Sequence, residues 1–211
     1  MALTGVQKTV LVCVASIALV VGAVVNKVTQ PAPLDRTALQ EAGIYLFDSP
    51  RPIPDVSLRS AADQPWGRDN LTGQWDLLFF GYTFCPDICP TTLAELRQLM
   101  QKLPEATRSQ LQVTFVSVDP NRDTPEQITT YLNFFSAGFA GATGESEQLA
   151  TLAKALSIAY IEPDTSSENY LVDHSGQGVI VDPNGRYVGF IRPPLNTEKL
   201  AQWLPRIIGA E

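Results

Sequence analysis

The sequence predicts an α/β domain, with a central mixed sheet flanked by helices, behind one N-terminal transmembrane helix. Three observations lead to this prediction. An uncharged apolar run covers Val10 to Val25. Strand-like and helix-like segments then alternate through the middle of the chain, which favours parallel strands joined by right-handed crossovers. Near the C-terminus, Asp182-Pro-Asn-Gly185 lies between two strand-like segments and is typical of a hairpin turn.

The N-terminal run predicts a membrane anchor over residues 1–27. Sixteen residues form a helix of about 24 Å, against a hydrocarbon core of about 30 Å, and the flanking Lys8 and Lys27 can snorkel to the headgroups. A cleaved signal peptide is the alternative, but Asn26-Lys27-Val28-Thr29 is a poor cleavage site. Cys13 is predicted to be a lipid-facing apolar residue rather than a lipidated cysteine, because Leu11-Val12 lacks the small residues expected before a lipidation site.

The charges around this helix give a weak orientation signal. Lys8 and the α-amino group favour a cytoplasmic N-terminus, which places the following domain in the periplasm. The N-terminus is not the Arg- and Ser-rich segment of a transit peptide, so a bacterial inner membrane is predicted.

Prolines dominate the segment after the helix. Pro31, Pro33, Pro50 and Pro52 predict an extended, semi-rigid tether over residues 28–52, with the folded domain at 53–211. Within that domain, Val56–Leu58 and the region near Trp66 are predicted to pair as a short hairpin.

The remaining elements follow from their hydrophobic periodicity. WDLLFFGY, Trp75 to Tyr82, predicts a strand buried on both faces, and LQVTFVSV, Leu111 to Val118, a second strand. Helices are predicted from Pro90, from Thr124-Pro125-Glu126 with a cap and a proline at its first position, and from Glu145 to Leu156. Strands Gly178–Val181 and Tyr187–Ile191 and a helix through Leu200, Trp203, Leu204 and Ile207 complete the order. That layout is thioredoxin-like with an inserted helix.

The charge balance excludes one class of partner. The formal net charge is −7, and since Lys8 and Lys27 are the only charges in residues 1–27, the rest of the chain carries −9. Nucleic-acid binding needs a basic face, so no nucleic-acid partner is expected, whereas a basic protein partner is compatible.

Two cysteines lie where the first central strand meets its helix, in Cys85-Pro-Asp-Ile-Cys89-Pro90. Pro90 suggests that Cys89 lies at or just before the helix N-cap, where the helix dipole favours a thiolate. Two such sulfurs can chelate a metal or form a disulfide, and the spacing does not decide between these. Redox sites of thioredoxin type have two intervening residues and this pair has three. Thr83-Phe84-Cys85 is one residue short of a peroxidase motif.

His174 is the only histidine in the chain. It precedes the strand from Gly178, and in a thioredoxin-like fold this loop lies beside the cysteine loop. Two thiolates and one imidazole make a soft three-ligand site that suits copper, whereas structural zinc normally takes a fourth protein ligand. A surface histidine and a structural disulfide are the plainer alternatives.

Four stretches resemble the Sco/SenC family of copper chaperones for cytochrome c oxidase. They are Phe80-Gly-Tyr-Thr-Phe-Cys-Pro-Asp-Ile-Cys-Pro90, Val118-Asp-Pro-Asn-Arg-Asp-Thr-Pro125, Leu171-Val-Asp-His-Ser175 and Val181-Asp-Pro-Asn-Gly185. The resemblance implies that Cys85, Cys89 and His174 bind copper, which a donor protein supplies and the binuclear site of oxidase subunit II receives.

The resemblance also implies supporting roles for acidic residues. Asp87 would face the partner protein, and Asp173 would orient the His174 ring. Asp119 and Asp123 would organise a loop near the site rather than bind the metal. Phe84 departs from the family pattern, which often has histidine at that position, so His174 is expected to be the sole nitrogen ligand.

Three functions compete on these observations. The first is a copper metallochaperone, which is a binding protein rather than an enzyme. The second is a thiol–disulfide oxidoreductase in which Cys85 and Cys89 are catalytic and reduce the cysteines of subunit II. The third is a redox or copper sensor, or a peroxidase.

Overall fold

The structure is a computed structural model that describes residues 4–29, 34–135, 137–159, 161, 165 and 170–209. The chain divides into two units, residues 1–34 and residues 35–209. The first unit contains helix α1, Gly5–Thr29. Within the described residues one helix, over Gly5–Val25, is long and apolar enough to cross a membrane, a criterion that a signal sequence also meets. The hydroxyl of Ser16 donates to the Val12 carbonyl at 2.9 Å, so its polar group is satisfied within the helix.

The predicted tether is wrong over most of its length. Residues 30–33, with Pro31 and Pro33, lie outside the described residues, but the chain after them is folded. Asp35 caps helix α2, Arg36–Glu41, and strand β1, Ile44–Pro52, pairs antiparallel with β8. Because β1 is the first strand of the sheet, Pro50 and Pro52 lie on an edge, where a missing N–H costs no ladder bond. The second unit therefore begins at Asp35, not at residue 53.

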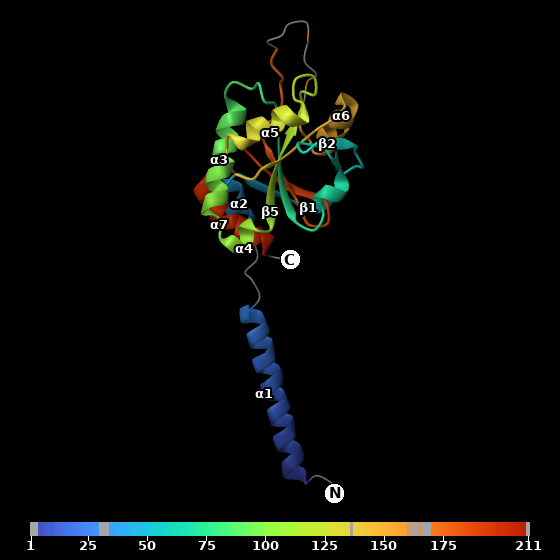
Figure 1. The fold of residues 1–211 in the computed structure, drawn as a ribbon. Coiled ribbons are helices and arrows are strands. Elements are labelled where there is room, and N and C mark those ends of the chain that lie inside the picture. The colour runs from blue at the N-terminus through green and yellow to red at the C-terminus, as the bar shows by residue number, and fades with distance from the viewer. Residues whose placement is uncertain are drawn as a thin grey trace. The chain divides into compact units, whose positions relative to one another are not determined.

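The second unit is built around one eight-stranded mixed sheet in the order β1-β8-β7-β4-β5-β6-β2-β3. Figure 1 shows the strands at the centre of this unit with the helices around them. The pairs β4–β5 and β5–β6 are parallel, and the other pairs are antiparallel. The remaining strands are β2 Leu58–Ser60, β3 Pro65–Trp66, β4 Trp75–Gly81, β5 Leu111–Ser117, β6 Ala140–Thr143, β7 Gly178–Val181 and β8 Arg186–Ile191. The predicted mixed sheet and the hairpin between β2 and β3 are confirmed.

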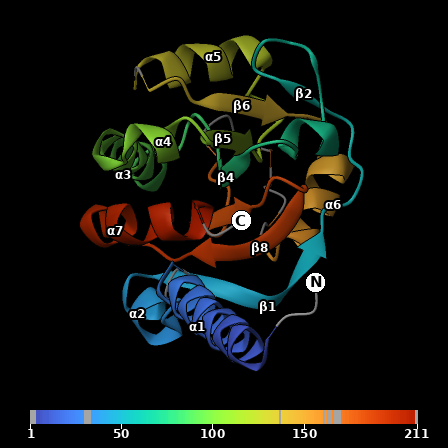
Figure 2. The ribbon, with the colours of Figure 1, turned by 90° about the horizontal axis from the view of Figure 1, so that it is seen from below.

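The helices pack on this sheet as amphipathic segments should. Helices α3 and α7 lie side by side, α5 covers β6, and α2 lies against β1 (Figure 2). Their bounds are η1 Arg68–Leu71, α3 Ile88–Lys102, α4 Glu105–Arg108, α5 Pro125–Asn133, α6 Ser146–Ala155 and α7 Thr197–Ile208. The predicted start of α5 is confirmed, since the Thr124 hydroxyl accepts from the Gln127 N–H at 3.2 Å.

Short or small-residue elements escaped prediction. Strand β6 has the sequence Ala-Gly-Ala-Thr, which carries no alternating apolar signal. A Cβ on its Gly141 would lie 2.5 Å from the Ile128 side chain, so the glycine allows α5 to approach β6 closely. Small residues are thus used here for close packing, which a hydrophobicity pattern does not register.

The central strand β4 connects the hydrophobic core to the cysteine loop. All seven residues of β4 are buried, in agreement with the prediction of a strand covered on both faces. Its last residue, Gly81, leads into the loop that carries Cys85, and α3 begins three residues later at Ile88. The strand that organises the core therefore also fixes the position of the cysteine loop.

Candidate metal centre

The cysteine loop is compact and buried. The Cys85 N–H donates to the Tyr82 carbonyl at 3.2 Å, and the Cys89 N–H donates to the Cys85 sulfur at 3.4 Å. Both cysteines are free thiols, and Cys89 is fully buried. Cys89 is the second residue of α3 and Pro90 the third, so the helix begins earlier than Pro90 suggested. A proline in the first turn is tolerated because its N–H would have had no helical partner.

His174 lies on a second segment, residues 170–175, called the histidine stem below, which is hydrogen-bonded to Ala159 and Ile161. The Ser175 N–H donates to the Ala159 carbonyl at 2.8 Å, and the Ile161 N–H donates to the Asp173 carbonyl at 3.0 Å. The Ala159 N–H donates in turn to the Ser175 hydroxyl at 2.8 Å. His174 therefore sits on a hydrogen-bonded stem just before β7, in the position predicted from the sequence.

The three predicted ligands come together. The Nε2 atom of His174 lies 3.6 Å from the Cys89 sulfur, and the ligand atoms of Cys85, Cys89 and His174 all lie within 4.8 Å of one another. An ion at the centre of such a triangle would be about 2–3 Å from each atom, close to the distances of about 2.0–2.3 Å at which proteins bind transition metals through nitrogen and sulfur. The residues present thus fit a small soft cation.

The orientation of the imidazole also suits a metal. Its Nδ1 atom lies 3.2 Å from the Ser175 carbonyl. A carbonyl only accepts, so this contact selects the tautomer with hydrogen on Nδ1 and leaves the Nε2 lone pair facing the sulfurs. The prediction that Asp173 orients the ring is wrong, since its side chain is exposed and a backbone carbonyl takes that place. Tyr82 holds the ring edge-on, with centroids 5.9 Å apart.

Burial controls the protonation of the ligands. It raises the pKa of the Cys89 thiol well above its usual range, although a backbone hydrogen bond from Tyr82 acts in the opposite direction. Burial also lowers the pKa of His174, against smaller raising effects of its Ser175 contact and of Asp173. The expectation that the helix terminus favours a thiolate is therefore outweighed at Cys89, and a metal must displace its proton.

Asp119 and Asp123 organise the neighbouring β5–α5 loop, as predicted. Both are fully buried, and neither belongs to the group of metal-ligating atoms. One oxygen of Asp123 accepts from the Thr83 N–H at 2.9 Å and from the Ser117 hydroxyl at 2.6 Å, and the other accepts from the Thr83 hydroxyl at 2.6 Å. Asp123 thereby fixes the cysteine loop two residues before Cys85.

Sequence reasoning missed three residues that shape this region, Tyr82, Arg122 and Tyr170. Arg122 lies in the stretch from Val118 to Pro125 and Tyr82 ends the central apolar run, but neither has a sequence signal that reveals its partner. Tyr170 lies far along the chain from Asp119, to which its hydroxyl donates at 2.6 Å. Contacts between such distant residues appear only in the tertiary structure.

The site opens into a hollow of about 250 Å³. It is lined by Tyr82, Cys85, Pro86, Asp87, Ile88, Leu171, Val172, Asp173 and His174. Asp87 is exposed at its edge and makes no side-chain capping bond to α3, which leaves its carboxylate available to a partner. The hollow thus gives access to Cys85 and His174, whereas Cys89 lies buried behind them.

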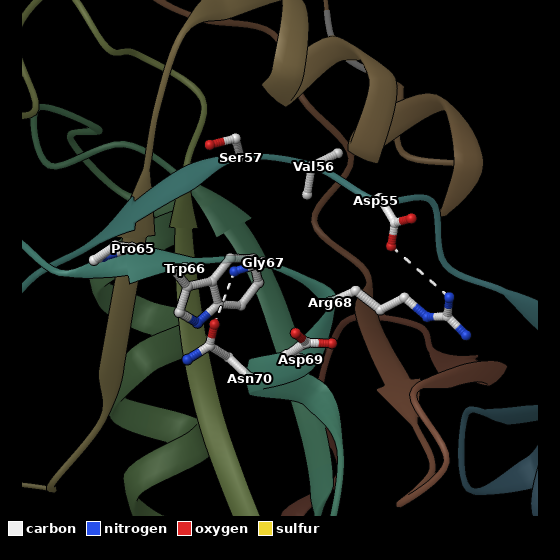
Figure 3. Close-up of a pocket in the computed structure, with 9 residues that line it drawn as sticks. All are labelled: Asp55, Val56, Ser57, Pro65, Trp66, Gly67, Arg68, Asp69 and Asn70. Atoms are coloured by element: carbon white, nitrogen blue, oxygen red, sulfur yellow. Dashed lines mark hydrogen bonds and ion pairs between the residues drawn. The ribbon is translucent and has the colours of Figure 1, made fainter.

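A second hollow, of about 340 Å³, is unrelated to this chemistry. It lies around β2, β3 and η1 and is lined by Asp55, Val56, Ser57, Pro65, Trp66, Gly67, Arg68, Asp69 and Asn70 (Figure 3). Its charged groups include the pair Arg68–Asp55 at 3.8 Å. It contains no cysteine or histidine, so its greater size does not make it the site of soft-metal binding.

Comparison with known proteins gives a consistent result. The sequence model of the SCO1/SenC family matches residues 51–209. A protein of Stutzerimonas stutzeri described as a putative copper-binding protein is 45% identical over 179 residues, which are 84% of this chain and 88% of that protein. The crystal structure of Arabidopsis thaliana ScoI with copper bound superposes with a TM-score of 0.69 at 30% identity, over 75% of this chain and 99% of the other.

Yeast Sco1 with copper bound shares the same fold, with a TM-score of 0.71 at 26% identity over 77% of this chain and 91% of the other. These likenesses confirm the thioredoxin-like prediction and span the cysteine loop, the histidine stem and the sheet between them. The family match covers well over half of the sequence. The chain therefore belongs to the SCO1/SenC family.

Proposed function

We propose that this protein is a copper metallochaperone that binds copper through Cys85, Cys89 and His174 and delivers it to the binuclear copper site of cytochrome c oxidase subunit II. The observation that carries the proposal is the convergence of two thiols and one imidazole within 4.8 Å. Family membership supports the choice of copper over another soft cation, because relatives in this family are described with copper bound.

The residues themselves indicate how copper is taken up and released. The thiols lose their protons on binding, and the Nε2 lone pair of His174 is already directed at the sulfurs. Thiolate and imidazole ligands suit Cu(I), and a three-ligand site leaves room for an incoming ligand from a partner. The hollow beside Cys85, His174 and Asp87 is where such a partner would approach.

Membrane attachment and partners complete the proposal. Helix α1 anchors the protein in a bacterial inner membrane with the second unit in the periplasm, where a donor protein supplies copper. A charge of −9 after residue 27 favours partners with a basic contact surface. A reporter that is active only outside the cytoplasm, fused after residue 34, tests the orientation, and an inactive fusion would reverse it.

A Cu(I) titration of the reduced fragment of residues 30–211 against a chromophoric chelator tests the metal site. One copper should bind tightly, and His174→Ala should abolish tight binding. Asp173→Asn is the matched control: its carboxylate is exposed and does not hold the ring, so affinity should be unchanged. A His174→Ala protein that still binds one Cu(I) tightly would sink the three-ligand site.

A second function, thiol–disulfide exchange with the cysteines of subunit II, is favoured by one observation. Cys85 and Cys89 are free thiols in direct contact through the Cys89 N–H, and their sulfurs lie within 4.8 Å of one another. Exchange does not need the imidazole, so His174→Ala should leave its rate nearly intact. Weak copper binding that the mutation leaves unchanged would make this the main function, with the reduction potential as the next measurement.

A further inference from the structure

We propose that the β5–α5 loop, Asp119–Asp123, is a bracket that holds the histidine stem at a fixed distance from the cysteine loop, and that Tyr170 is a positioning residue for His174. The inference rests on the proposed copper function. It concerns three contacts that lie outside the metal ligands, and each joins this loop to one or both of the segments that carry the ligands.

The first arm of the bracket holds the cysteine loop. Thr83 donates both its backbone N–H and its hydroxyl to Asp123, at 2.9 Å and 2.6 Å. Asp123 is fixed in turn by the Ser117 hydroxyl at the end of β5. Because Asp123 is fully buried, these are charge-assisted bonds without competition from water when the carboxylate is ionised.

The second arm holds the histidine stem. The Tyr170 hydroxyl donates to one oxygen of Asp119 at 2.6 Å, and Arg122 donates to the other oxygen through Nε at 2.5 Å. Asp119 is also fully buried. Tyr170 lies four residues before His174, so this bond fixes the chain close to the imidazole.

Arg122 joins the two arms. Its guanidinium carbon lies 3.6 Å from the centre of the Tyr170 ring and 4.9 Å from the centre of the Phe84 ring. One cation therefore contacts an aromatic ring from the histidine side and one from the cysteine side. The Phe84 ring gives Arg122 an aromatic partner next to Cys85.

The bracket matters because the ligands come from segments that are far apart in sequence. The stem is joined to Ala159 and Ile161 by its own hydrogen bonds, but those bonds do not set its distance from the cysteines. A ligand held in place before the metal arrives loses less freedom on binding, which raises affinity. Loosening the bracket should therefore weaken copper binding only through His174.

The test is Tyr170→Phe in the full-length protein in detergent micelles. This change removes the hydroxyl that bonds Asp119 and keeps the ring beside Arg122. Tyr45→Phe is the matched control, because Tyr45 stacks on Phe190 at the edge strand β1, three strands away from β4. Thr83→Val is a second variant, which removes the hydroxyl bond to Asp123 and the bond that this hydroxyl accepts from Gln127 at 3.3 Å. Thr129→Val is its control, since the Thr129 hydroxyl bonds the Ala61 carbonyl instead.

Cu(I) affinity and hydrogen–deuterium exchange are both measured. Tyr170→Phe should lower Cu(I) affinity about tenfold, which corresponds to about 1.4 kcal/mol. In a His174→Ala background it should leave the weak residual Cu(I) affinity unchanged. In the metal-free protein it should speed exchange of the Ile161 and Ser175 amides about tenfold. Tyr45→Phe should change neither quantity, and Thr83→Val should lower affinity in the same way.

Each outcome either supports the bracket or overturns it. Equal losses of affinity with and without His174, or unchanged exchange at Ile161 and Ser175, would overturn the bracket and assign Tyr170 a merely structural role. Faster exchange in a protein that binds no Cu(I) at all would reject the proposed copper function and leave the bracket as a device that orders the two loops. If Tyr170→Phe does not fold, its urea denaturation curve will show no unfolding transition. The Cu(I) affinity of Thr83→Val then tests the bracket instead.

Discussion

Gly81→Ala is predicted to weaken copper binding by displacing the Cys89 sulfur. Gly81 is the last residue of β4, and a Cβ built on it would lie 2.8 Å from the Phe115 ring and 2.9 Å from the Cys89 sulfur. Both distances are too short for a methyl group, so a neighbour must move. Phe115 and Cys89 are both fully buried, but only the Cys89 sulfur belongs to the metal site, so any shift of the sulfur acts directly on copper binding.

The size of the effect follows from these contacts. Adding one methyl to a packed core costs about 1–3 kcal/mol, and that is the expected loss in the free energy of unfolding. The sulfur must move by about half an ångström to relieve the overlap, whereas metal sites require ligand distances correct to about 0.2 Å. Cu(I) affinity should therefore fall by about tenfold or more.

Urea denaturation and Cu(I) competition titration measure the two losses. Gly176→Ala is the matched control, because a Cβ there meets only Pro193, at 3.5 Å, which is an ordinary contact. Its effects on both quantities should be small. A Gly81→Ala protein with unchanged stability and unchanged affinity would refute the reasoning that this glycine makes room for the Cys89 sulfur.

Two further predictions concern pH. Burial raises the pKa of Asp76 from 3.8 to about 6, so the folded protein binds this proton more tightly than the unfolded chain, and Asp76 makes stability fall as pH rises from about 4 to 6. Asp76→Asn should remove that loss, about 3 kcal/mol at pH 7 and about 0.6 kcal/mol at pH 4, in urea denaturation curves; a difference between the two proteins that is constant across pH would contradict it. Copper affinity should rise with pH by about tenfold per pH unit for each thiol proton displaced, because Cys89 remains protonated at neutral pH. Cu(I) competition titrations at pH 6, 7 and 8 test this, and a flat affinity would exclude thiolate ligation.

Local sequence determined most of the elements of the fold. The dense apolar run WDLLFFGY suits a strand buried on both faces, and Thr124-Pro125-Glu126 carries its own helix start, so both were predicted closely. The alternation of strands and helices with a final hairpin was enough for the thioredoxin-like arrangement. The segment before residue 53 was misjudged because prolines in a tether and prolines on an edge strand have the same local preference, and only the pairing of β1 with β8 distinguishes them.

The metal ligands were predictable because their chemistry is rare in this chain. One histidine and one close cysteine pair leave few candidates, and the resemblance to the Sco/SenC family singled out Cys85, Cys89 and His174 as the expected ligands before any distance was known. The sequence did not decide how the site is held. The Nδ1 partner of His174 is a backbone carbonyl, which no side-chain pattern marks, in place of the neighbouring Asp173.

The tertiary structure alone decided the environment of these ligands. The loop with Asp119 and Asp123 meets Thr83 and Tyr170, residues about 40 and 50 positions away, and burial rather than the helix terminus sets the protonation of Cys89. The sequence by itself determined which residues can bind the metal, because ligand chemistry belongs to single side chains. Their distances, burial and hydrogen-bond partners depend on contacts between distant segments, and these exist only once the chain has folded.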